Sequence, residues 1–272
     1  MTAAVRNGTT SDEAAKRLEH CSSYWNGVGQ RNPYGAILTG RTGNLPEWDL
    51  EAFFETGKAD AARFVAELER IAPAIRRHRL LDFGCGVGRV SRALAQYFEA
   101  VVGVDAAEAM IARARELNAS CRNCEFVVNG DTDLRRFDAG TFDVVYSRLV
   151  LQHIPPELVR RYIPALVRVL APGGVLMFQL PDAMPDARTA YVRAPVVGHG
   201  LKQRLPRVLV RMYRHIKYPF IVDASVRKMP MFGMVHDEVL TLVRDAGARV
   251  LAIAPDQSHG PTPGGYEYWL SR

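Results

Sequence analysis

Three glycines at alternate positions mark the part of the chain whose residue types could bind a ligand. The segment Asp82-Phe83-Gly84-Cys85-Gly86-Val87-Gly88 follows an apolar run and precedes a helical pattern. Glycines at such a turn let the backbone approach a ligand closely and adopt dihedral angles that other residues avoid. Arg89 stands where a dinucleotide fingerprint places its last glycine, and no Gly-Lys-Ser/Thr follows. The spacing therefore disfavours NAD, FAD and a phosphate-binding loop.

Acidic residues follow the next two apolar runs. Asp105 comes 21 positions after Gly84, and Asp131 closes the segment Asn129-Gly130-Asp131. A carboxylate at the first position can accept both hydroxyls of a ribose, and one at the second can accept an adenine amino group. Each acid alone is more simply a helix cap. Together with the glycine turn they predict a nucleoside-binding edge.

Apolar strands alternate with amphipathic helices from residue 58 onwards. Such alternation predicts an α/β fold with a parallel sheet that is covered on both faces. The last two strands are separated by a short loop, which predicts an antiparallel hairpin. Residues 1–20 are expected to be polar and frayed, and the next stretch, with Tyr24, Trp25 and Trp48, to be rich in turns. The expected strands are 80–83, 101–104, 125–128, 142–146, 175–180, 250–254 and 266–270, and the expected helices 58–71, 89–97, 107–117, 156–170 and 237–245.

These motifs in this order resemble the class I S-adenosylmethionine-dependent methyltransferases of the small-molecule type. The resemblance covers 58–182 and 234–272, and the motifs that carry it also include 142–147 and 170–174. It implies a Rossmann-like, seven-stranded, mostly parallel sheet whose last strand is antiparallel. It further implies an N-terminal lid, 1–57, and a methyltransferase domain, 58–272, whose helical insertion after the fifth strand, 184–234, caps the substrate pocket.

The resemblance also implies a role for each matching position. The three glycines would pass under the methionine part of S-adenosylmethionine, and Asp82 would orient their loop. Asp105 would hold the ribose, while Ala106 or Met110 would flank the adenine. The remaining cofactor positions that it implies are Asp131 and Thr132 at the adenine edge and Ser147 and Arg148 beside the methionine.

Transfer of a methyl group to a hydroxyl is helped by a base that removes the proton. His153 follows the fourth strand, and an imidazole titrates near neutral pH; packing at the mouth of the next helix is the alternative. His259 and Asp256 lie in the loop between the last two strands. If the sixth strand is parallel to the others, these two residues reach the substrate; the alternative is a surface hairpin. Neither histidine is assigned to catalysis by position alone.

The basic character of the chain is concentrated in the insertion. The net charge is +6, yet ten basic residues and one acid lie within 188–228. Arg211 lies in a predicted helix, 206–218, with an apolar face and a basic face. The arginines could be solvated, bind an anionic acceptor such as a nucleotide- or lipid-linked sugar, or contact an anionic membrane surface. Trp25 and Tyr34 would form part of the lid and contact the substrate, or belong to a core.

Several function classes are disfavoured. The composition, 48% hydrophobic and 24% charged, is that of a soluble globular protein. No apolar stretch is long enough to span a membrane or serve as a secretory signal, so a cytoplasmic enzyme is expected. Cys121 and Cys124 have no second ligand pair nearby, so no metal is predicted. A nucleic-acid methyltransferase would be expected to show an Asn/Asp-Pro-Pro-Tyr/Phe motif after the fourth strand, and this chain has none there. A non-catalytic partner protein would be expected to have a degraded glycine loop, whereas this loop is intact. An O-methyltransferase acting on a small molecule, in an unknown oligomeric state, is therefore the favoured interpretation.

Overall fold

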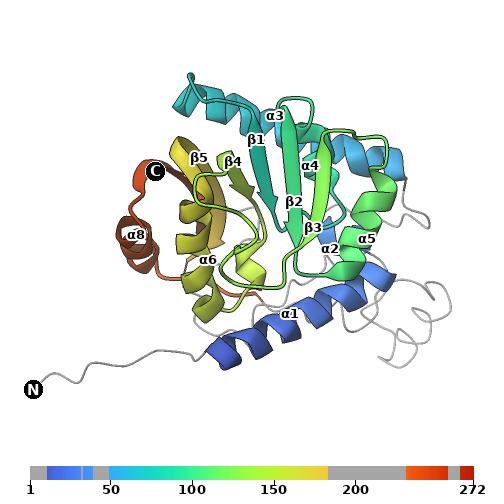
Figure 1. Cartoon of the computed structure of the whole chain (residues 1–272), viewed down its shortest axis with the longest axis horizontal. Coiled ribbons are helices and arrows are strands. Elements are labelled where there is room, and N and C mark those ends of the chain that lie inside the picture. The colour runs from blue at the N-terminus through green and yellow to red at the C-terminus, as the bar shows by residue number, and fades with distance from the viewer. Residues whose placement is uncertain (1–10, 32, 39–48, 183–230, 257–263) are drawn as a thin grey trace, which may run out of the picture.

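A seven-stranded sheet forms the centre of the computed structural model, which describes residues 11–31, 33–38, 49–182, 231–256 and 264–272. The strand order is β3-β2-β1-β4-β5-β7-β6, and only β7 runs antiparallel to its neighbours. This arrangement confirms the predicted sheet (Figure 1). The strands are β1 (Arg79–Phe83), β2 (Ala100–Asp105), β3 (Cys124–Val128), β4 (Phe142–Ser147), β5 (Leu170–Pro181), β6 (Arg249–Asp256) and β7 (Gly265–Ser271).

Helices cover both faces of the sheet, as the alternating pattern predicts. On one face α3 (Leu50–Ile71) and α4 (Arg89–Leu94) pack on side chains of β1, β2 and β4. On the other face α6 (Pro156–Val169) and α8 (His236–Asp245) bury their apolar sides. The helix α5 (Glu108–Leu117) packs against β2 and β3. Because both faces are covered, β4 is buried along its whole length, and apolar or aromatic side chains occupy four of its six positions.

The N-terminal region differs from the expectation. Residues 11–31 form one long helix, α1 (Ser11–Arg31), so the predicted fraying of 11–20 and the turn-rich stretch at Tyr24 and Trp25 are wrong. The helix forms because Ala14 and Leu18, four residues apart, are buried in the main core, and Arg17 forms an ion pair with Glu157 of α6. Figure 1 shows α1 crossing the end of the sheet at which β1, β2 and β3 finish.

Two further boundaries are shifted. The helix α3 begins at Leu50, not at residue 58, because Asp49 caps it by accepting hydrogen bonds from the N–H groups of Glu51 and Ala52. The proposed division between lid and domain, at residue 57, thus lies inside a continuous helix. The helix after β1 ends at Leu94, three residues earlier than expected. A short helix, α2 (Pro33–Ile37), and a 3-10 turn, η1 (Leu151–His153), complete the described elements.

The C-terminal hairpin brings the carboxyl end of β6 to the same edge of the sheet as the glycine turn. Since β7 is antiparallel to both β5 and β6, the strand β6 is parallel to β5. The carboxyl end of β6, at Asp256, therefore lies level with the end of β5, and both Asp256 and Pro181 pair with Gly265. No helix among the described residues is long and apolar enough to cross a membrane. His259, Arg211 and the predicted helix 206–218 lie outside the described residues.

Candidate active site

The glycine turn between β1 and α4 has the backbone that its sequence predicts. Gly84, Gly86 and Gly88 have φ values of +79°, +54° and +77°. Such values are costly for residues that carry a Cβ. The N–H groups of Gly84 and Cys85 donate to the carbonyl of Val104, which ties the turn to β2. The turn is therefore held rigidly at the carboxyl ends of two adjacent strands.

Asp105 closes this turn from the end of β2. Its Oδ2 accepts the N–H of Gly86 at 3.0 Å, and its Oδ1 accepts the N–H of Ala107 at 2.9 Å. Burial raises the pKa of Asp105, and the N–H donors oppose this effect. Each carboxylate oxygen can accept more than one hydrogen bond. A ribose diol can thus bind to the same group that orients the glycine turn.

Asp82 is the most deeply buried acid of the turn. Its side chain is 3% exposed and accepts a hydrogen bond of 2.6 Å from Ser91 Oγ in α4. Burial raises the pKa of Asp82 to about 6, although the Ser91 hydrogen bond lowers it. Asp82 thus joins β1 to α4, the helix that follows the glycine turn.

The residues predicted for the adenine lie beyond β2 and β3. Asp131 uses Oδ1 to accept the N–H of Asp133 at 2.9 Å, so its carboxylate also shapes its own turn. Thr132 is buried beside it. Met110 is 2% exposed and packs with Val28 of α1, whereas Ala106 is partly exposed. Ala106 and Met110 follow β2, whereas Asp131 and Thr132 follow β3, and Met110 is also part of the contact between α1 and α5.

The N-terminal helices lie over this edge. Ile37 of α2 is the nearest side chain to Gly86, because a Cβ there would come within 3.3 Å of its Cδ1. Asn26 Oδ1 of α1 accepts the N–H of Ala109, which fixes α1 to the first turn of α5. Tyr34 contacts Phe53 edge to face at 5.1 Å. The aromatic residues of this region therefore belong to a small core that holds α1 and α2 in place over the glycine turn.

A second group of polar residues lies beyond β4. Ser147 is fully buried, and its Oγ has no hydrogen-bond partner among the described residues. Arg148 is 13% exposed; its guanidinium lies 3.6 Å from Asp60 of α3 and 4.0 Å from Asp256 of β6. Asp60 also forms an ion pair of 2.8 Å with Arg89. The fold thus brings the predicted Arg148 and Asp256 together across the sheet edge.

His153 lies next to α1. Its ring is 5.3 Å from the ring of Trp25 in α1, and its Nε2 lies 3.0 Å from Gln152 Nε2. Gln152 Oε1 is buried without a partner among the described residues. Rotating the Gln152 amide by half a turn satisfies this oxygen, because it would accept the Nε2 proton of His153. In that arrangement Nδ1 is the basic nitrogen of the imidazole.

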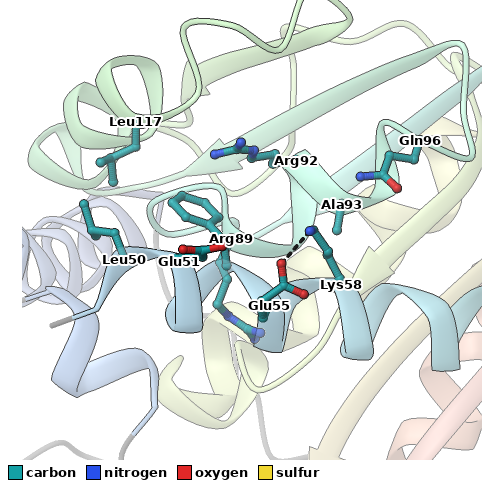
Figure 2. Close-up of a pocket in the computed structure, with 10 residues that line it drawn as sticks. Leu50, Glu51, Glu55, Lys58, Arg89, Arg92, Ala93, Gln96 and Leu117 are labelled. Atoms are coloured by element: carbon teal, nitrogen blue, oxygen red, sulfur yellow. Dashed lines mark hydrogen bonds and ion pairs between the residues drawn. The ribbon is translucent and has the colours of Figure 1, made fainter. Parts of the chain in front are cut away.

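A cavity in the described part of the chain lies elsewhere. It has a volume of about 450 Å³ and is lined by α3, α4 and the end of α5, with Phe54, Arg92 and Gln96 among its residues. Figure 2 shows Lys58 and Glu55, which form an ion pair on its wall. None of the predicted cofactor-binding residues lines it. It is therefore separate from the glycine-turn edge.

Sequence reasoning missed Asp60, Asn26 and Gln152. The sequence did contain a signal for Asp60. It lies one turn before Phe64, beside the apolar stripe that α3 buries, and a carboxylate in such a place needs a partner. Asn26 and Gln152 had none, since their partners are distant in sequence or become buried only in the folded chain.

The residues of this edge fit S-adenosylmethionine. The positive φ values of the three glycines allow a tight turn at the strand end, Asp105 can accept the ribose hydroxyls, and the buried Ser147 hydroxyl is a polar group that still needs a partner. A nucleoside joined to a zwitterionic amino acid would use all three features.

Comparisons with known proteins agree with this geometry. Residues 81–178 match the family model described as a methyltransferase domain. The chain is 30% identical over 184 residues to the ubiquinone biosynthesis O-methyltransferase of Bordetella avium, covering 66% of this chain and 73% of that protein. The chain belongs to the class I S-adenosylmethionine-dependent methyltransferases.

Other relatives of the methyltransferase are matched over about half their length. The trans-aconitate 2-methyltransferase of Variovorax paradoxus is 33% identical over 54% of this chain and 55% of its own. The malonyl-[acyl-carrier protein] O-methyltransferase of Herminiimonas arsenicoxydans is 38% identical over 42% of this chain and 41% of its own.

Solved structures share the fold of the methyltransferase. The magnesium protoporphyrin IX methyltransferase of Synechocystis PCC 6803 with bound SAM has a TM-score of 0.57 at 18% identity, covering 98% of this chain and 99% of that one. A SAM-dependent methyltransferase of Leishmania major has a TM-score of 0.60 at 14% identity, covering 93% and 82%.

Proposed function

We propose that this methyltransferase transfers the methyl group of S-adenosylmethionine to an oxygen atom of a small anionic acceptor. The observation that carries the proposal is the Asp105 carboxylate, which orients the glycine turn through Gly86 and is placed to accept a ribose. Two of the sequence relatives described above are named O-methyltransferases. The sugar acceptors considered from the sequence, nucleotide- or lipid-linked, remain predictions.

In the proposed complex the cofactor is held by residues at the carboxyl ends of β1, β2, β3 and β4. The turn from Gly84 to Gly88 would support the methionine part, and Asp105 would accept the ribose hydroxyls. Ser147 Oγ would bind the amino-acid end of the cofactor, which would give this buried hydroxyl the partner it needs. Asp131 and Thr132 would bind the polar edge of the adenine, and Ala106 and Met110 would form the walls of the adenine pocket.

The acceptor is proposed to lie over the ends of β4 and β5, below α1. The bound cofactor supplies an activated methyl group, so the protein must align the acceptor oxygen with it and exclude water. His153 would remove the proton of an acceptor hydroxyl, with Gln152 fixing the ring through Nε2. A carboxylate acceptor would need no base, since it is already ionised at neutral pH.

The family resemblance assigns Arg148 to the methionine part of the cofactor; we propose instead that it recognises the negative charge of the acceptor. Its guanidinium is almost enclosed, it is 4.0 Å from Asp256, and its Nε has no partner among the described residues. A fork of N–H donors matches a carboxylate or phosphate well. Arg211 and the basic insertion would add to this attraction, as would Trp25 and Tyr34 to the shape of the pocket. His259 would be a second candidate base. A peripheral membrane contact of the insertion also remains a prediction.

Calorimetric titration with S-adenosylmethionine and with its demethylated product tests the cofactor assignment. The parent is expected to bind both, and Asp105→Ala to bind about 10- to 100-fold more weakly, because a charge-assisted hydrogen-bond acceptor is lost. Asp245→Ala, an exposed acid at the end of α8, is the matched control and should bind like the parent. Equal binding by the Asp105 variant would refute the ribose assignment.

A set of acceptors tests the second half of the proposal. Methyl transfer should be measured to hydroxyl and carboxyl compounds, each with a neutral analogue of the same size. Anionic acceptors should be methylated with the lower KM, and Arg148→Gln should remove this preference. A preference for neutral acceptors, or for nitrogen atoms, would contradict the proposal without affecting the cofactor assignment.

A further inference from the structure

Two thiols meet in the turn between α5 and β3. The N–H of Cys124 donates to the carbonyl of Cys121 at 3.3 Å, which closes a four-residue turn. The two Sγ atoms are 2.7 Å apart, and both cysteines are free and partly exposed. A disulfide bond measures about 2.05 Å, so the sulfur atoms need to approach by only about 0.7 Å to form one.

Neither metal binding nor methyl transfer accounts for this pair. The described residues contain no group of three or more cysteine, histidine or acidic side chains that could hold a metal ion. The pair lies at the amino end of β3, opposite the edge that carries Asp105 and Asp131. The remaining two thiols are elsewhere: Cys85 is buried in the glycine turn, and Cys21 lies in α1.

The two thiols differ in their surroundings. Cys124 packs against the apolar clusters on the α4 and α5 side of the sheet, and its Sγ lies 3.7 Å from the carbonyl of Ser91. Burial and the adjacent Cys121 thiol raise the pKa of Cys124. Cys121 belongs to none of these clusters; its Sγ lies 3.7 Å from Asn123 Oδ1. Cys121 is therefore the thiol that a reagent meets first.

We propose that Cys121 and Cys124 form a reversible disulfide by exchange with a small-molecule disulfide such as oxidised glutathione. The Cys121 thiolate attacks one sulfur of the oxidant, which gives a mixed disulfide and releases one thiol. The Cys124 thiolate then attacks the Cys121 sulfur, closes the intramolecular bond and releases the second thiol. Two electrons pass from the cysteines to the oxidant, and the two cysteine protons leave with the released thiols.

The thiol turn is connected to the cofactor turn by two routes. The N–H of Cys121 donates to the carbonyl of Asn118, whose Nδ2 donates to the carbonyl of Val87 at 3.0 Å. On the other side, the Cys124 thiol lies against Ser91, which binds Asp82. Oxidation removes the S–H donor that faces the Ser91 carbonyl. The oxidised protein is therefore expected to bind S-adenosylmethionine about twofold more weakly, as the loss of a weak hydrogen bond implies.

Mass spectrometry of the whole protein in glutathione redox buffers tests the exchange. As the oxidised share rises, the parent should lose the mass of two hydrogens, with the bond mapped to Cys121 and Cys124, and a dithiol reductant should restore it. Cys124→Ser should accumulate glutathione on Cys121, because the second thiol is missing. Cys121→Ser, the matched control, should accumulate far less on Cys124. The rate of closure in the parent should rise with pH, since more of the Cys124 thiol is then ionised.

Other outcomes would overturn the proposal. A parent that keeps both thiols in fully oxidised glutathione, or that retains a stable glutathione adduct, would show that the pair does not close. A bond mapped to Cys21 or Cys85 would place the chemistry elsewhere. Calorimetry with S-adenosylmethionine on oxidised and reduced parent tests the link to the cofactor turn, with equally treated Cys121→Ser as the control. Equal affinities in the parent would refute that link.

Discussion

Two parts of the carboxyl edge of the sheet satisfy their polar groups differently. The first, called the cofactor edge, lies at the ends of β1 and β2, and the second, called the acceptor edge after its proposed role, lies at the ends of β4 and β6. At the first, Asp105 and Asp82 accept hydrogen bonds of 2.6 to 3.0 Å from residues within nineteen positions of them. At the second, the Oγ of Ser147 and the Nε of Arg148 have no partner among the described residues, and Arg148 lies 3.6 to 4.0 Å from its two carboxylates.

This difference matches the two ligands of the proposed reaction. The cofactor is the same throughout the family, whereas the acceptor differs between members. A preformed turn binds a constant cofactor without reorganisation, and local hydrogen bonds are enough to preform it. Buried polar atoms without partners are costly, so those near β4 are the ones that a ligand would complete. The first edge is therefore built for rigidity. At the second, the amino-acid end of the cofactor would complete the contacts of Ser147, and an acceptor would complete those of Arg148.

Gly88→Ala should produce the largest loss of stability, because it places a side chain inside the glycine turn of the cofactor edge. Its φ is +77°, and a Cβ there would lie 2.7 Å from Phe126 and from Asn118. Strain and overlap together should lower the free energy of unfolding by about 3 to 4 kcal/mol. Gly140→Ala is the matched control, because its φ is +75° but its nearest neighbours are at 3.8 Å. It should lose only about 1 kcal/mol in urea titrations. Equal losses would mean that the close packing of the turn is unimportant.

His153→Ala tests the acceptor edge through the proposed base. Turnover of a hydroxyl acceptor should fall by about 100-fold or more, with the affinity for S-adenosylmethionine unchanged. His78, an exposed histidine before β1, is the control, and His78→Ala should leave turnover unchanged. Normal turnover in the His153 variant would remove the histidine from the mechanism. A fall in cofactor affinity would show instead that the two edges are not separable at this residue.

Asp82 makes the stability of the cofactor edge dependent on pH. Its carboxyl has a pKa of about 6 in the folded chain, against an ordinary value of 3.8. The native state thus binds more protons between these values than the unfolded state. Its contribution is fully present below about pH 4 and is lost as the pH rises through 6, by about 2 to 3 kcal/mol. Urea titrations should therefore show that the free energy of unfolding of Asp82→Asn, relative to that of the parent, rises by this amount between pH 4 and pH 7. A gain independent of pH would contradict it.

Asp60→Asn tests the point at which the two edges meet, because Asp60 contacts both Arg89 and Arg148. The loss of its charge should lower the free energy of unfolding by about 1 to 2 kcal/mol, less than for a fully buried pair because Asp60 is partly exposed. Glu55→Gln, which breaks an exposed pair with Lys58 on the same helix, should cost under about 0.5 kcal/mol. If the two variants lose the same stability, the buried network is no stronger than a surface ion pair.

Much of the cofactor edge could be predicted because its contacts are local in sequence. The spacing of Gly84, Gly86 and Gly88, with Asp105 one strand later, is enough to place a turn at the end of a parallel strand. The glycines have positive φ, and Asp105 binds Gly86, as a rigid turn of this kind requires. The α1 helix was missed because its apolar positions are few, and burial of Ala14 and Leu18 in the main core decides its formation.

The sequence alone determined the strand and helix alternation, the glycine turn and the acids that follow it, since each depends on residues a few positions apart. Only the tertiary structure decided that α1 covers the sheet edge, that Asp60 joins Arg89 to Arg148, and that Asp256 reaches Arg148 from the last hairpin. These contacts join segments separated by 29 to 108 positions. Their partners are chosen by how the helices and the antiparallel strand pack, and no local pattern records that choice.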